Sequence, residues 1–386
     1  MTSIGNACRR AKWTACLSIG IGLLALAACG SPAAQPSGVA GSSAGSAAAG
    51  QPWDDVVAAA KKEGKLGLLG PTGDVLRQAL IDPFQAKYGI SVDYLGAGGP
   101  EVTPRVQKER AAGLFSWDAF MLGTDTLVSG LKPLGAIDPI QSALVLPEVK
   151  DPKYWRDGKL PLYDSEGTML TVLRHAATYL YYNSDQVQES ELASWRDLLN
   201  PKLKGKLLIG RDPRLSGYGR AVFQFLYMKD GLGPDFIRAL AQQNPTILRD
   251  DHTSAQWLAQ GKFPICICSD VEANQLMVAG VQAVKYAGIM KEGTHVTGAQ
   301  FNLALANRAP HPNAAKVFIN WLLSQEGSAA FSKTAGYPST RADVPTDQMP
   351  AWSIPQPDDV DINTPAAVEI EKPLLVLLNE VLPSAN

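Results

Sequence analysis

Short apolar runs alternate with helical patterns in the first half of the chain. From Trp53 to Glu63 the apolar positions lie on one helical face, and Gly64 follows where the helix would end. Strand-like apolar runs cover 65–69, 90–95 and 117–122, and helical patterns begin at Asp74 and run through Val102 and Val106. This order of strand, helix, strand, helix, strand predicts parallel strands joined by right-handed crossovers.

A second unit of the same kind follows two extended segments, at 168–173 and 177–183. Its expected strands are 206–209 and 265–268, and 301–306 returns as a further strand. The expected helices are 195–199, 221–228, 254–259, a segment through Leu276, 313–324 and 366–382. The pattern therefore predicts two α/β units in one chain, which a length of 386 residues allows.

Glycine-rich and polar loops follow the expected strands. Ligands of open α/β sheets bind outside the carboxyl ends of the strands, so these loops are the candidate binding site. The candidate ligand-binding residues are Thr72, Gly73, Gly98, Gly99, Thr124, Ser216, Gly217, Tyr218, Ser269 and Asp270.

The loop 216–219 precedes an apolar helix and favours an anionic group. Unpaired backbone N–H groups and the partial positive charge of a helix N-terminus suit a carboxylate, a phosphate or a metal-bound anion. Gly217 lets the backbone approach such a ligand, and Ser216 adds a hydroxyl donor. The alternative is that the glycines only form a tight turn.

The first 28 residues are typical of a secretion signal. Arg9, Arg10 and Lys12 precede an apolar run at 16–28, which is too short to span a bilayer. Small residues then precede Cys29, and this resembles a bacterial lipobox in which the cysteine is lipid-modified. Residues 29–52 carry no charge before the body of the chain and are rich in Ser, Ala and Gly, which predicts a flexible tether.

Composition excludes several classes of protein. A net charge of −2 provides no general basic field for nucleic acid. With four histidines and five cysteines, an all-protein zinc cluster is not expected, and no cofactor or metal site is predicted. Cys266 and Cys268 remain open to three interpretations: two small buried hydrophobic residues, which we favour, a redox-labile pair, or soft-metal ligands. A mutual disulfide would be strained at this spacing.

Seven segments between Trp53 and Asp343 resemble the extracellular solute-binding proteins of ABC importers, in the branch that contains ferric-iron and thiamine binders. These segments are 53–54 with 58–65, 88–90, 109–113, 200–206, 212–217, 309–316 and 321–327. The resemblance implies a two-lobed type II periplasmic-binding-protein fold, each lobe a mostly parallel sheet flanked by helices, with a hinge of two crossing strands. The expected organisation is a signal peptide (1–28), a tether (29–52), the first part of lobe 1 (53–175), lobe 2 (176–284), and a return to lobe 1 with a C-terminal helix (285–386).

The same resemblance implies a lipid-anchored monomer outside the cytoplasm that captures a small solute and delivers it to an ABC permease and its ATPase. A secreted lipoprotein enzyme on a similar scaffold is the alternative, but none of the four histidines lies in a nucleophile motif. The usual ferric-iron ligands are not matched: the expected acid falls near Gly123, and the expected tyrosine pair falls near Ser269 and Asp270. An anionic solute or iron(III) held through an anion are the expected chemistries.

Two polar clusters near the expected cleft have competing interpretations. Arg211, Arg214 and Arg220 would suit an anionic solute or form surface salt bridges. The run from Asp250 to His252 would bind a metal or, as we favour, provide the N-cap of the following helix.

Overall fold

The computed structural model describes residues 52–215 and 217–385. The predictions for the signal peptide, for Cys29 and for Ser216 lie outside these residues. Within the described part of the chain, no helix is long and apolar enough to cross a membrane.

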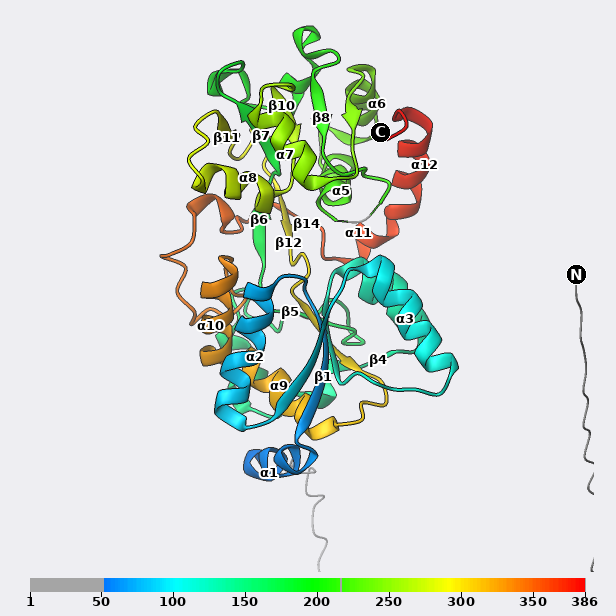
Figure 1. Cartoon of the computed structure of the whole chain (residues 1–386), viewed down its shortest axis with the longest axis vertical. Helices are drawn as coiled ribbons and strands as arrows, with labels where there is room; N and C mark the ends of the chain where they lie inside the picture. Colours follow the sequence, from blue (N-terminus) through cyan, green and yellow to red (C-terminus); the bar gives the residue numbers. More distant parts are fainter. Residues whose placement is uncertain (1–51, 216, 386) are drawn as a thin grey trace, which may run out of the picture. The chain divides into compact units, whose positions relative to one another are not determined.

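The sheet of lobe 1 has the order β2-β1-β3-β13-β4, with β5 also paired to β13 (Figure 1). Its strands are β1 (Lys65–Gly70), β2 (Ser91–Gly96), β3 (Ala119–Leu122), β4 (Ile137–Asp138), β5 (Leu170–Thr171) and β13 (Asn302–Ala306). β1 pairs in parallel with β2 and β3, whereas β13 runs antiparallel to β3. The parallel core is as predicted, and the returning strand is inserted in the opposite direction.

Helices cover both faces of this sheet, which explains the continuous apolar run in β1. Leu68 belongs to the core beneath one face, and its neighbour Leu69 belongs to the core beneath the other. The helices of lobe 1 are α1 (Trp53–Glu63), α2 (Asp74–Tyr88), α3 (Gly99–Ala111), α4 (Pro147–Lys150), α9 (Pro312–Leu323) and α10 (Gln325–Ala335). Phe84 packs edge-on against Phe318 at 5.3 Å between ring centroids, which joins α2 to α9.

The sheet of lobe 2 has the order β11-β7-β10-β8-β9. Its strands are β7 (Leu180–Asn183), β8 (Leu207–Ile209), β9 (Thr246–Ile247), β10 (Ile265–Ile267) and β11 (Val284–Tyr286). Its helices are α5 (Tyr218–Met228), α6 (Gly233–Gln242), α7 (Asp251–Ala259) and α8 (Asp270–Val278). β8 pairs in parallel with β9 and β10, and β7 is antiparallel to β10 and β11. The predicted two-lobed α/β class is confirmed.

A small third sheet connects the lobes. β12 (His295–Thr297) pairs antiparallel with β6 (His175–Ala177) and parallel with β14 (Val360–Asp361). These strands lie between the two larger sheets in Figure 1. The structure therefore has the two expected crossing strands and adds a third, β14.

The third crossing takes the C-terminus back to lobe 2. The single helix expected at 366–382 is two helices, α11 (Pro365–Glu369) and α12 (Glu371–Val381), which meet at Ile370. Leu374, Leu377 and Leu378 bury their side chains in the core of lobe 2. We expected the whole segment 285–386 to return to lobe 1, but only part of it does. Its last helix, α12, packs its leucine face against the core of lobe 2.

Cys266 and Cys268 form a disulfide with 5.3 Å between their Cα atoms. Both side chains are fully buried on and after β10. Our favoured interpretation, two unlinked small hydrophobic residues, is wrong in this structure. We expected a strained disulfide because we placed both cysteines on one extended strand. Cys268 lies just beyond the three-residue strand β10, where the backbone need not be extended.

Candidate functional site

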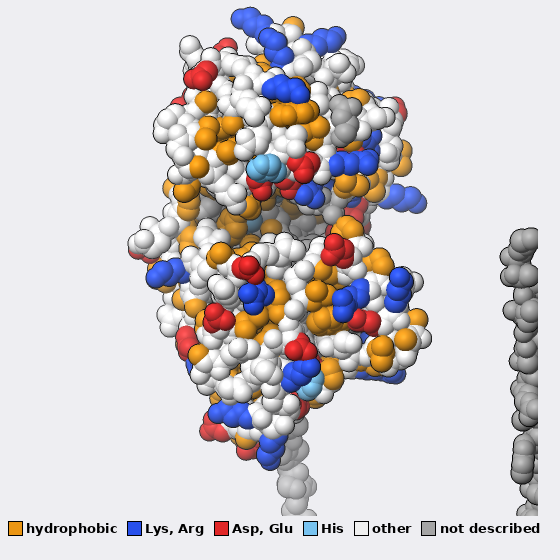
Figure 2. Space-filling model, viewed as in Figure 1, with side chains coloured by type: hydrophobic (Ala, Val, Ile, Leu, Met, Phe, Trp, Pro, Cys, Tyr) orange, Lys and Arg blue, Asp and Glu red, His pale blue; other side chains and the backbone are white. Residues whose placement is uncertain are grey.

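A cavity of about 380 Å³ lies between the two lobes, and we call it the interlobe cavity. Figure 2 shows the hollow that separates the two halves of the described body. Lobe 1 lines it with residues that follow β2 and β3, lobe 2 with residues of α5, α7 and α8, and the hinge with residues that follow β12 and β14. The carboxyl ends of several strands therefore meet at one place, as the rule for α/β sheets requires.

Six of the ten predicted binding residues line the interlobe cavity. They are Gly98, Gly99, Thr124, Gly217, Tyr218 and Asp270. Ser216 is outside the described residues. The structure does not place Thr72, Gly73 or Ser269 in the lining: the first two are exposed on the loop after β1, and Ser269 is buried at the N-cap of α8.

The loop after β1 is held by a neighbouring strand. The hydroxyl of Tyr94 on β2 donates a hydrogen bond of 2.5 Å to the carbonyl of Pro71. Thr72 and Gly73 follow Pro71 in this loop, and both are exposed to solvent. Of the loops after β1 and β2, it is the loop after β2 that lines the cavity.

The N-termini of α3 and α5 are among those that face the interlobe cavity. α3 begins after Gly98, and α5 begins after Gly217, which has a φ of 92° that favours glycine. Neither N-cap residue has a side chain, so neither can cap the first-turn N–H groups itself. Gly99 allows Thr126 to pack closely against the start of α3, because a Cβ at position 99 would lie 2.4 Å from Oγ1 of Thr126.

Arg211, Asp251 and Tyr218 form a connected group on the lobe 2 wall. The guanidinium of Arg211 donates two hydrogen bonds to the Asp251 carboxylate, at 3.1 and 2.5 Å. The Tyr218 hydroxyl donates to the same carboxylate at 3.1 Å. Burial, followed by the Asp251 charge, raises the pKa of Tyr218, so this hydroxyl remains a donor at neutral pH.

The other two arginines of the predicted cluster have protein partners as well. Arg214 pairs with Asp212 at 2.7 Å. Arg220 lines the cavity, but its guanidinium donates to the carbonyls of Pro213 and Arg214 at 2.7 and 2.6 Å. The guanidinium groups of these three arginines thus bond mainly to other groups of the protein. For Arg211 and Arg214 the partners are carboxylates, as the salt-bridge interpretation expected.

An acidic pair crosses the interlobe cavity. Asp125 follows β3 of lobe 1, and Glu371 is the first residue of α12 on lobe 2. Burial, followed by the negative charge of Asp125, raises the pKa of Glu371 to about 7, and Gln224 donates to the same carboxyl group at 3.2 Å. Near neutral pH, Glu371 is therefore partly protonated.

Asp270 lines the same cavity and also contacts both lobes. It is the first residue of α8, and its carboxylate accepts a hydrogen bond of 2.6 Å from the hydroxyl of Tyr337, which packs against the core of lobe 1. Burial raises the pKa of Asp270. Asp270 is thus both a cavity residue and a link between the lobes.

Asp250 and His252, on either side of Asp251, have structural contacts. The Asp250 carboxylate accepts a hydrogen bond of 2.6 Å from the backbone N–H of Thr253 and caps α7, as we favoured. His252 contacts Glu272 at 3.0 Å. Among the described residues, no three His, Cys, Asp or Glu side chains converge as metal ligands.

Several cavity residues were missed by sequence reasoning. They are Tyr179, Gln224, Thr297, Asn363, Val368 and Glu371, among others. Asn363 and Glu371 reach the cavity only because the chain crosses the hinge a third time, and the two-residue strand β14 has no recognisable hydrophobic pattern.

Comparisons with known proteins agree with this architecture. Residues 79–357 match a family model described as bacterial extracellular solute-binding protein, which is the family that the sequence motifs resemble. A Trichodesmium protein (IdiA, FutA) in complex with iron and citrate is similar in structure: TM-score 0.64, 20% identity, covering 82% of this chain and 99% of that one.

Two further solved structures have the same fold. Iron-bound HitA from Pseudomonas aeruginosa has a TM-score of 0.62 and 21% identity, covering 82% of this chain and 99% of that one. AfuA from Actinobacillus pleuropneumoniae, with fructose-6-phosphate bound, has a TM-score of 0.60 and 18% identity, covering 82% of this chain and 98% of that one. At these identities the similarity establishes the fold.

Proposed function

Because this chain belongs to the bacterial extracellular solute-binding proteins, we propose that it captures a small solute in the interlobe cavity and delivers it to an ABC import permease. Family membership makes it a binding protein of the extracytoplasmic space. The observation that carries the proposal is the cavity itself, which brings together residues from both lobes and from the hinge that joins them. A solute that contacts both walls stabilises the closed arrangement of the lobes.

The walls favour a solute with an anionic group. The N-termini of α3 and α5 both face the cavity, and each provides backbone donors and a partial positive charge. Citrate and fructose-6-phosphate, which are bound in two proteins of the same fold, both carry anionic groups. For this chain we therefore propose an anionic group at these two helix ends, with ferric citrate as the iron-containing alternative.

Small-angle scattering tests the proposed capture. Thermal-shift screening of the purified protein against amino acids, sugar phosphates, phosphate, thiamine, polyamines and ferric citrate identifies binders, because a ligand that binds only the folded state raises its stability. The tightest binder should then reduce the radius of gyration. If no solute in the screen binds, or if a tight binder leaves the scattering curve unchanged, the proposed capture between closing lobes is wrong.

We also propose that Cys29 anchors the protein to the membrane through lipid. The support is its place after a charged segment, an apolar run and small residues. Stable anchoring takes more than one acyl chain, so loss of the modified cysteine should release the protein. Cys29→Ala should move the protein from the membrane fraction to the medium, whereas Cys16→Ala should not. Retention of the Cys29→Ala protein in the membrane fraction would contradict the assignment.

A further inference from the structure

We infer that the solute is a small zwitterion, whose ammonium group binds between Asp125 and Glu371 while its anionic group binds at the N-termini of α3 and α5. This inference rests on the proposed function and names the substrate class of the same cavity. It changes the expectation from the sequence, which considered an anionic group without a cationic counterpart.

The first step is that two acids line the same cavity from opposite lobes. Asp125 is exposed and Glu371 is half-buried, and they come from opposite lobes of the protein. Both side chains line the interlobe cavity. Burial, followed by the negative charge of Asp125, raises the pKa of Glu371 to about 7, so Glu371 carries a proton in part of the molecules near neutral pH. An ammonium group has three donors and a positive charge, and it replaces that proton while it binds both carboxylates.

The groups around Glu371 do not neutralise the pair. Arg220 is the nearby cation, and it lowers the pKa of Glu371, yet its guanidinium already donates to two carbonyl groups. Gln224 donates one neutral hydrogen bond. Tyr163 contributes no charge near Glu371, since burial raises the pKa of its hydroxyl to about 12. Once Glu371 is ionised, the site has an excess of negative charge.

The second step concerns the arginine closest to the proposed anion site. Arg211 lines the cavity, but the Asp251 carboxylate accepts two of its hydrogen bonds and compensates its charge. Recognition of the anionic end is therefore left mainly to the backbone donors at Gly99 and Tyr218, where α3 and α5 begin. Such a site suits one compact carboxylate and provides little additional charge for a highly charged anion.

The third step concerns size and lining. A cavity of about 380 Å³ accommodates a small organic molecule, and a bare metal ion would leave most of it empty. Its apolar lining includes Ala97, Ala221, Ala299, Ile362 and Val368. These side chains suit a short hydrocarbon body between two charged ends.

Matched probes test this assignment on the purified full-length protein. The probes are the twenty protein amino acids and 4-aminobutyrate, with acetate, butyrate and butylamine as one-charge analogues, and fructose-6-phosphate and ferric citrate as anionic and iron-containing solutes. Calorimetry in two buffers of different ionisation enthalpy measures both affinity and proton release. At least one zwitterion should bind ten times more tightly than its one-charge analogues.

The same titrations should depend on pH. Since ammonium binding needs both carboxylates ionised, affinity for the zwitterion should rise about tenfold between pH 6 and pH 8, with release of a proton. Glu371→Gln should weaken binding at least tenfold and remove this pH dependence. Glu369→Gln, which changes an exposed acid two residues away, should do neither. Asp125→Asn provides an independent variant on lobe 1.

Three results would overturn the inference. One is tight binding of fructose-6-phosphate or ferric citrate with no binding of any amino acid, which would leave the proposed capture function standing. Another is zwitterion binding that neither Glu371→Gln nor Asp125→Asn weakens. The third is that no probe of any class binds, which would also contradict the proposed function.

Discussion

The hydroxyl of Tyr337 donates a hydrogen bond of 2.6 Å to the carboxylate of Asp270, and this contact joins lobe 1 to lobe 2 beside the hinge. The ring of Tyr337 stacks on His175 of hinge strand β6, with 4.0 Å between centroids. Opening of the lobes at this side must therefore break a hydrogen bond to a charged group, which is worth roughly 1.5–3 kcal/mol.

Tyr337→Phe should shift the ligand-free protein toward a more open arrangement. The substitution keeps the ring and removes only the donor to Asp270, so the closed arrangement loses a contact that an open one lacks. Small-angle scattering should show a larger radius of gyration. Tyr94→Phe is the matched control, since its hydroxyl bonds to Pro71 within lobe 1. Equal curves for both variants and the wild type would mean that this contact does not hold the lobes.

Acid should destabilise the fold through the hinge histidines. His175 and His295 are fully buried, and within the described residues neither ring has a hydrogen-bond partner. Burial lowers the pKa of both to about 3, with a further contribution of His175 to His295. When a basic group has a lower pKa in the folded than in the unfolded state, the protein loses stability as pH falls below the unfolded-state pKa, here near 6.5. The loss is about 1.4 kcal/mol per pH unit for each ring.

Urea unfolding of the wild type and of His295→Leu at pH 7 and pH 5 measures this effect. The variant should lose about 2 kcal/mol less than the wild type over that interval, because it lacks one of the two rings. His252→Gln, which changes an exposed histidine, should retain the wild-type pH dependence. Identical losses in wild type and His295→Leu would show that this ring does not drive the acid sensitivity.

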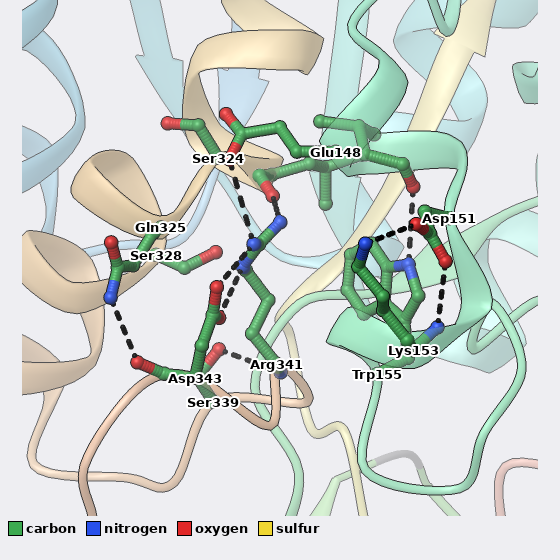
Figure 3. Close-up of polar contacts among 12 residues, drawn as sticks. Glu148, Asp151, Lys153, Trp155, Ser324, Gln325, Ser328, Ser339, Arg341 and Asp343 are labelled. Carbon is green, nitrogen blue, oxygen red and sulfur yellow. Dashed lines mark hydrogen bonds and ion pairs between the residues drawn. The ribbon is translucent and has the colours of Figure 1, made fainter.

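Arg341 should be a major stabilising residue of lobe 1. Its side chain is fully buried, donates to Asp343 at 2.8 and 2.7 Å, and donates to the carbonyl of Leu323 at 2.8 Å (Figure 3). Removing one member of a buried ionic network costs about 3–5 kcal/mol, because the remaining groups lose their partner. Arg341→Met should lower the free energy of unfolding by about that amount.

The exposed pair of Arg238 with Glu380 is the control for Arg341. Arg238→Ala should lower the free energy of unfolding far less, because exposed ion pairs contribute little to stability. Chemical denaturation with a common slope compares the two variants. A loss for Arg341→Met no larger than that for Arg238→Ala would contradict a stabilising role for the network.

Tyr218→Phe should weaken solute binding with little effect on folding. The substitution removes the hydroxyl that orients Asp251 and keeps the ring that packs against the core of lobe 2. Affinity for the cognate solute should fall three- to tenfold, equivalent to about 0.7–1.4 kcal/mol. Tyr227→Phe, on the same helix and outside the cavity lining, should bind as the wild type does. If Tyr218→Phe and Tyr227→Phe bind the solute with equal affinity, the Tyr218 hydroxyl does not contribute to solute binding.

Local pattern was sufficient to predict most elements of the fold. The helix at Trp53–Glu63, ended by Gly64 with a φ of 69°, is found at its expected boundaries. The strands near Lys65, Ser91 and Ala119 and the helices of lobe 2 also follow their apolar periodicity. These elements bury a continuous face, so their hydrophobic spacing is visible in the sequence itself. The glycine loops that follow strands also identified six residues of the cavity lining.

The pairing of distant residues was decided only by tertiary structure. Asp125 and Glu371 are 246 positions apart and line the same cavity because β14, two residues long, carries the chain across the hinge a third time. A strand this short has no periodicity, and the leucine face of α12 is compatible with packing on either lobe. The sequence by itself therefore determined the family, the two lobes and the loops at the strand ends. Which charges face each other across the cavity depends on how the lobes pack, because long-range contacts have no local signal.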